Sequence, residues 1–214
     1  MKKLIIFTLA IALGSPALPQ SKEYSKAMAG AIQMMNEASS PESFQKSIKQ
    51  FEELAATYPD QWLPCYYQAQ ALAMLSLREK DIPTIDGNLD RALEAIEKAD
   101  TIHPEESEIY VIKALLNLGR ITVDPVGRGA IYFEAVSFDI LKARELNPEN
   151  PRAHFIQALL TLYMPEFLGG GPAGAKPKFL EAAKKFKSFE NPDPLWPDWG
   201  EDLNQDELEK LNDK

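Results

Sequence analysis

Residues 51–77, FEELAATYPDQWLPCYYQAQALAMLSL, set a pattern that recurs at 96–119 (IEKADTIHPEESEIYVIKALLNLG) and at 141–163 (LKARELNPENPRAHFIQALLTLY). In each stretch, the sequence predicts an amphipathic helix that ends at a proline, a polar turn, and then a second helix. The prolines of the three stretches, Pro59, Pro104 and Pro148, lie 45 and 44 residues apart. Similarity at a fixed period is typical of an array of structural repeats.

Two further rows of residues keep the same phase. Ten residues after each proline stands an alanine, and eight residues before each proline stands a large apolar residue. These residues are Ala69, Ala114 and Ala158, and Phe51, Ile96 and Ile140. Helices approach closely only where a side chain at the crossing is small, so the alanines predict helix crossings. The proline cannot continue a helix and therefore ends each unit at the same place.

This pattern resembles the tetratricopeptide repeat, in which a small residue lies in the first helix, two small residues seven apart lie in the second, and a proline closes the unit. Ala92 and Ala99 match the pair, and Val136 with Ala143 matches it with one substitution. The resemblance covers residues 24–190 and implies an all-α solenoid of helix–turn–helix repeats, wound as a right-handed superhelix. The family repeat has about 34 residues, and the repeat found here is ten longer.

We expect the additional residues to form long loops inside the units, at 78–88, 120–130 and 164–174. Each of these segments contains a proline followed by a glycine, which favours turns. Insertions in one slot of a stacked array emerge along one edge, so the three loops should lie side by side. The third loop carries Phe167, Gly169, Gly170 and Gly171. Its glycines either form a structural turn or contact a ligand through free N–H groups. No Lys-Ser or Lys-Thr follows them, which excludes a nucleotide P-loop.

The N-terminal 20 residues have the pattern of a secretory signal peptide. Lys2 and Lys3 precede an apolar run at 4–13 and a stretch of small residues. The run is too short to span a bilayer, which takes about 20 apolar residues. The sequence therefore predicts export, to the periplasm or the medium, without a stable membrane anchor, and cleavage between Gly14 and Gln20.

The net charge of the chain limits the classes of partner that it can bind. The formal net charge is −9, and removal of residues 1–20 would leave 21 basic and 32 acidic residues. An acidic surface disfavours nucleic acid and anionic membranes as partners.

After a predicted repeat domain at 21–190, residues 191–214 form a bend rich in tryptophan and proline and an acidic segment. We expect Trp196, Trp199, Leu203 and Leu208 to cap the open face of the last repeat.

Residues for catalysis or metal binding do not stand out. Neither His103 nor His154 has a second histidine or a cysteine at the spacing of metal ligands. The known catalytic motifs are missing, and Cys65 lies among apolar residues, as a buried cysteine does. The sequence therefore predicts a non-enzymatic protein with no catalytic residue, metal site or cofactor.

The resemblance implies a binding surface instead. In the family, the concave face is lined by positions seven, eleven and fifteen residues after each closing proline. Here these are Tyr66, Gln70, Met74, Val111, Leu115, Gly119, Phe155, Leu159 and Tyr163. The lysines and asparagines that let some relatives clamp a peptide carboxylate are missing from these rows. The row is apolar and aromatic, and an exposed apolar surface of this kind usually binds a ligand or a partner.

Three alternatives follow for this concave row. The first is an exported scaffold that binds a protein or peptide partner through the row. The second is a periplasmic accessory of an envelope transporter, in which the row and the glycine loop form a pocket for a small molecule. The third is that the N-terminal helix or the tail of this chain fills the row.

Overall fold

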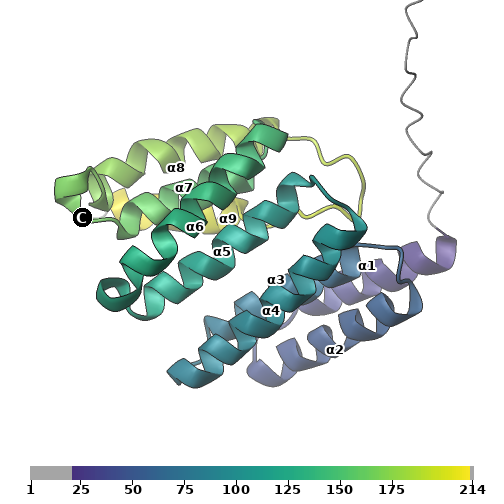
Figure 1. The fold of residues 1–214 in the computed structure, drawn as a ribbon. Coiled ribbons are helices and arrows are strands. Elements are labelled where there is room, and N and C mark those ends of the chain that lie inside the picture. Colours follow the sequence, from purple (N-terminus) through teal and green to yellow (C-terminus); the bar gives the residue numbers. More distant parts are fainter. Residues whose placement is uncertain (1–20, 213–214) are drawn as a thin grey trace, which may run out of the picture.

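The structure is a computed structural model that describes residues 21–212, and this part of the chain is all-α (Figure 1). Its helices are α1 (Lys22–Asn36), α2 (Pro41–Thr57), α3 (Leu63–Ser76), α4 (Ile82–Ile102), α5 (Ser107–Val123), α6 (Pro125–Leu146), α7 (Pro151–Tyr163), the 3₁₀ helix η1 (Glu166–Leu168), α8 (Gly171–Ser188) and α9 (Glu201–Asn212). Consecutive α-helices pack against one another from α1 to α9 in an antiparallel series. None of these helices is long and apolar enough to cross a membrane. The predicted signal peptide lies outside the described residues.

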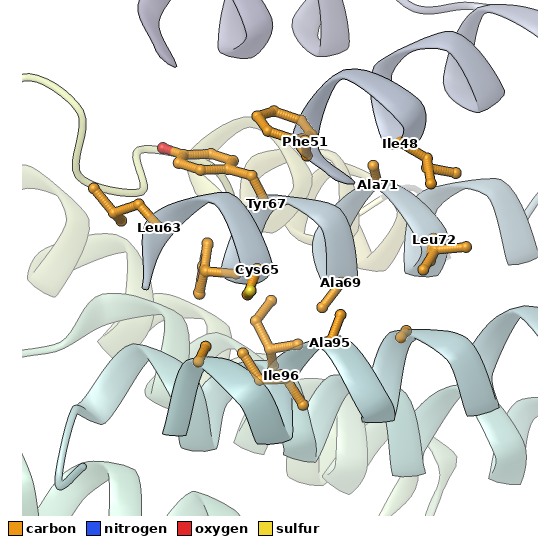
Figure 2. Packing of buried hydrophobic residues seen from close by; sticks show 14 of the residues in the cluster. Ile48, Phe51, Leu63, Cys65, Tyr67, Ala69, Ala71, Leu72, Ala95 and Ile96 are labelled. Carbon is orange, nitrogen blue, oxygen red and sulfur yellow. The ribbon is translucent and has the colours of Figure 1, made fainter. Parts of the chain in front are cut away.

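The predicted repeat units are present. Helices α2, α4 and α6 each end two residues before the closing proline, which is Pro59, Pro104 or Pro148. The side chains of Ala69, Ala114 and Ala158 are completely buried. In Figure 2, Ala69 of α3 points toward Ala95 of α4, at the place where the two helices approach each other. The prediction of a helix crossing is therefore confirmed for Ala69, and the complete burial of Ala114 and Ala158 agrees with it.

The prediction of long inner loops is wrong for the first two units. Residues 82–88 belong to α4, and only the single residue Asp124 separates α5 from α6. The reason is helix capping. The side chain of Asp81 accepts a hydrogen bond from the Thr84 N–H (3.0 Å), and Asp124 does the same for Gly127 (2.9 Å). Each aspartate precedes a proline in the first helical turn, where no N–H is needed. The extra residues thus lengthen the helices.

The C-terminal segment returns across the array before it forms α9. After α8, the chain crosses to the first turns of α3, where the Tyr67 hydroxyl donates to the carbonyl oxygen of Leu195 (2.9 Å). The indole N–H of Trp199 donates to the Tyr66 hydroxyl (2.8 Å). Trp199 contacts both hydrophobic clusters of the core, the one around α1–α4 and the one around α5–α8. The tail therefore joins the two halves of the core.

Helix α9 packs on α8 as the capping prediction expects, with one exception. Leu208 is buried and Trp196 packs against the core, but Leu203 is 42% exposed. Leu203 faces solvent because the contact surface of α9 is formed by Asn204, Leu208 and Leu211, which share one side of the helix, and Leu203 lies outside it. The Asn204 amide also donates to the Phe179 carbonyl oxygen of α8 (3.1 Å).

A buried ion pair lies beneath the returning tail. Arg152 in the first turn of α7 donates from Nε to both carboxylate oxygens of Glu108 in the first turn of α5, each at 2.9 Å. The Tyr66 hydroxyl (3.1 Å) and the Asn150 amide (2.6 Å) also donate to this carboxylate. Both charged side chains are almost completely buried. The pair thus links α3, α5 and α7 at the same end of each helix.

Candidate functional site

The predicted concave row is largely closed. Four of its members are buried, namely Tyr66, Gln70, Val111 and Phe155. Tyr66 lies under the C-terminal tail, where Trp199 donates a hydrogen bond to its hydroxyl. At this end of the row, the third alternative therefore applies, in which the tail of the chain fills the row. Met74, Leu115 and Gly119 line a small pocket of about 230 Å³ between α3, α4 and α5. Leu159 is half-buried against the second cluster. The last member, Tyr163, lies apart from the others and lines a larger groove.

That larger groove lies where the end of α5, the start of α6 and the end of α7 meet the turn around η1. Its volume is about 600 Å³. It is lined by Ile121, Pro125, Val126, Gly129, Ala130, Phe133, Glu134, Leu160, Tyr163, Met164, Pro165 and Leu168. We call this set the α6–α7 groove. Binding sites for small molecules have volumes of about 300–1,000 Å³ and mostly apolar walls, and the groove fits both criteria.

Several apolar side chains on or beside the walls of the groove are highly exposed to solvent. Val126 is 95% exposed because the single-residue connection at Asp124 turns the first residues of α6 outward. On the other wall, α7 ends at Tyr163, and the turn that follows places Leu168 on the groove and leaves Phe167 87% exposed beside it. Exposed apolar patches of this kind mark sites where a ligand or partner binds.

The glycine turn supports the second wall. Gly169 and Gly171 have positive φ angles of 83° and 73°, which other residues rarely adopt. A Cβ on Gly170 would collide with the carbonyl group of Met164. The N–H groups of Gly169 and Gly170 donate to the carbonyl oxygens of Glu166 (2.8 Å) and Pro165 (3.1 Å). Because these two donors are used inside the turn, the structural alternative is favoured over an anion cradle.

The groove carries little charge. Glu134 is the carboxylate among its lining residues. Burial and the nearby carboxylate of Glu207 on α9 raise the pKa of the Tyr163 phenol above its ordinary value. The phenol therefore stays protonated and neutral near pH 7. The arrangement can bind an apolar molecule, and its lining residues offer no acid–base or nucleophilic pair.

Both histidines lie outside the groove. Nε2 of His154 lies 3.0 Å from the Pro148 carbonyl oxygen, and Nδ1 lies 3.1 Å from a Glu181 oxygen. The ring of His103 stacks on Trp62. Within residues 21–212, no three His, Cys, Asp or Glu side chains are grouped in a way that could hold a metal ion. Cys65 is buried, and burial raises the pKa of its thiol.

Of the site residues predicted from the sequence, Tyr163 lines the groove, and Phe167 and the glycines belong to the turn beside it. Val126 was missed because residues 120–130 are predicted to form a loop, and Phe133 was missed because it lies beyond that segment and in none of the predicted rows. The signal that could have found them is the composition of 125–146, where apolar residues occur on all sides of one helix.

Searches of protein-family models and of curated proteins find no match. Among solved structures, the chain is similar to the HusA haemophore from Porphyromonas gingivalis. The identity is 25%, the match covers 92% of this chain and 96% of the other, and the TM-score is 0.78. The fold is therefore the all-α fold of that protein. Since a haemophore is a carrier of haem, the finding also agrees with the prediction of a non-enzymatic protein.

Proposed function

We propose that this chain is a haem-binding carrier and that the α6–α7 groove is its binding site. The observation that carries the proposal is an open, apolar and aromatic groove on a fold shared with a haemophore along nearly its whole length. Of the two functions predicted from the sequence, this one corresponds to the small-ligand alternative. The scaffold alternative loses support because four of the nine residues of its proposed surface, Tyr66, Gln70, Val111 and Phe155, are buried.

The shape and chemistry of the groove suit a porphyrin. A porphyrin is a flat, aromatic macrocycle with charged carboxylates at one edge. Phe133 and Tyr163 offer aromatic rings from the two walls, and rings of this kind stack on one another favourably. Val126 and Leu168 add apolar surface that is exposed in the free protein, so covering it would contribute about 25 cal/mol per Å². The open side of the groove leaves the carboxylates of the ligand in solvent.

Contact with the macrocycle should contribute more than a bond to iron. Tyr163 and Met164 are the lining side chains of types that bind haem iron in other proteins. A tyrosine binds iron as the phenolate, and the raised pKa of Tyr163 disfavours that form. Tyr163→Phe should therefore retain most of the affinity, whereas loss of the apolar walls should abolish it.

Titration of the purified chain with haem, followed by the change in the Soret absorbance band, tests the proposal. We expect saturable binding to the wild-type chain and at least a tenfold loss in Phe133→Asp and Leu168→Asp, because each places a charge against the apolar ligand. Leu180→Asp on α8 is the matched control, since Leu180 is also exposed but does not line the groove. Equal affinity in all four proteins would refute the proposed site, and the absence of saturable binding to the wild type would refute the function.

Two further inferences from the sequence fit this function. We infer that residues 1–20 direct export, since a carrier of haem has to meet its ligand outside the cytoplasm. We also infer that the array is a solenoid of the tetratricopeptide type, which the 44- and 45-residue spacing of its closing prolines supports. N-terminal sequencing of the protein from its native host tests the first inference, and an intact Met1 would contradict it.

A further inference from the structure

The outer face of α6 is apolar. Only four of its 22 residues are buried, namely Val136, Asp139, Ile140 and Ala143. On the other side of the helix, Ile131, Phe138 and Leu141 are 67%, 64% and 64% exposed. We call these three residues the outer stripe. In the described structure, α6 packs on α5 and α7 and leaves this face open (Figure 1).

The equivalent helices of the first two units, α2 and α4, do not share this feature. α2 exposes Lys46, Lys49 and Glu53, and α4 exposes Asp90, Arg91 and Glu94. A helix on the surface of a soluble protein normally has such a polar outer face. The residues 131, 134, 138, 141 and 145 follow one another at steps of three and four, which is the spacing of a helix that packs along another helix. The outer stripe is therefore a specific feature of α6, and we expect another surface to pack on it.

We propose that the partner is α6 of a second copy of this chain, packed antiparallel about a two-fold axis at Phe138. A two-fold axis brings the same surface of both copies together, so the surface must complement itself. Glu134 and Lys142 lie four residues to either side of Phe138. In an antiparallel pair centred there, each Glu134 lies opposite Lys142 of the second copy.

The other positions of the stripe agree with this register. Leu141 comes three residues after Phe138, so it faces Ala135 of the second copy, where a small side chain leaves room for it. Ile131 and Glu145 lie seven residues to either side and meet at the edges, where the carboxylate can remain in water. Lys142 already lies 3.4 Å from Glu145 in its own helix, so it is held on the side where Glu134 of the second copy would arrive.

The pairing is separate from haem binding. The groove uses another flank of α6, on which Val126, Gly129 and Phe133 lie. Of the charged residues invoked here, Glu134 also lines the groove, so oligomeric state and not haem affinity is the suitable readout. The proposal does not rest on the proposed function, and either can fail without the other.

Sedimentation velocity of the purified chain over about 5–500 µM tests the pairing, since a contact of this size is expected to be weak. We expect the wild type to shift from monomer to dimer within this range and Phe138→Glu to stay monomeric. Leu77→Glu is the matched control, because Leu77 is 66% exposed at the end of α3, away from the stripe, and this variant should dimerise like the wild type. A wild type that remains monomeric throughout, or a Phe138→Glu variant that dimerises normally, would overturn the proposal.

Two variants test the register itself. Glu134→Lys should weaken dimerisation at least fivefold by opposing Lys142 of the second copy, and addition of Lys142→Glu should restore it. Phe138→Cys should form a disulfide-linked dimer on mild oxidation, since its two copies meet at the axis, while the native Cys65 is buried and unreactive. Ile131→Cys should not. Cross-linking through Ile131→Cys alone, or no rescue by the double charge reversal, would overturn the antiparallel register.

Discussion

Replacement of Arg152 by methionine tests whether the buried ion pair holds the array and its tail together. Arg152 and Glu108 are both nearly inaccessible to solvent, with their closest atoms 2.8 Å apart. Methionine preserves much of the apolar volume of the arginine stem but removes the charge. The Glu108 carboxylate would then remain buried, with only the Tyr66 hydroxyl and the amide of Asn150 as side-chain donors.

The expected cost follows from this environment. Removal of one partner of a buried pair costs about 3–5 kcal/mol, because the other charge is left without compensation. For a chain of this size, 1 kcal/mol corresponds to about 2–4 °C, so the melting temperature should fall by roughly 6–20 °C. Differential scanning calorimetry at pH 7 measures this shift, and circular dichroism at 20 °C shows whether the variant is folded.

A second substitution separates charge from packing. In the double variant Glu108→Gln with Arg152→Met, no charge is buried, and the glutamine can still bond to Tyr66. We expect its free energy of unfolding to return to within about 2 kcal/mol of the wild type. If Arg152→Met alone lowers the melting temperature by less than 2 °C, or if the double variant is less stable than the single one, the pair does not act as described.

Three other changes test separate parts of the structure. Ala114→Leu should overpack the crossing of α5 and cost roughly 1–3 kcal/mol in chemical denaturation, and an unchanged midpoint would show that Ala114 is not at a crossing. Asp139 has its pKa raised to about 6 by burial, opposed by Lys113 and by a hydrogen bond from Asn117, so its ionisation destabilises the fold. Below about pH 4 the Asp139 carboxyl is neutral and does not destabilise the fold. The destabilisation grows as the pH rises and is complete above pH 6, so Asp139→Asn should stabilise the protein at pH 7, by up to about 3 kcal/mol, but not at pH 4. Equal effects at both pH values would contradict this. Deletion of residues 191–214 should lower the melting temperature and cause aggregation, because it uncovers Tyr66. Raising the salt concentration should have little effect on the full chain, since among the described residues the acids of α9 form no ion pairs with the lysines of α8. A truncated chain that remains monomeric and melts with the full chain would contradict the structural role of the tail.

The α6–α7 groove shows where sequence reasoning reached its limit. The apolar character of Tyr163 and of the turn at Phe167 could be read locally, because each stands in a distinctive context. The opposite wall could not, because Asp124-Pro125 is compatible both with a loop and with the start of a helix. Only the packing of α6 against α5 decided that the following residues are helical and that Phe133 faces the groove.

The helical repeat, its phase, and the prolines at which helices end can all be read from the amino-acid sequence. These features depend on residues close together in the chain and on a period that repetition makes visible. The tertiary structure alone decided that the tail covers Tyr66, that Arg152 meets Glu108, and that a groove opens beside α6. Each of these joins residues from different helices, such as Tyr66 and Trp199, Glu108 and Arg152, or Phe133 and Tyr163. Their pairing depends on the relative placement of whole helices, which no local pattern encodes.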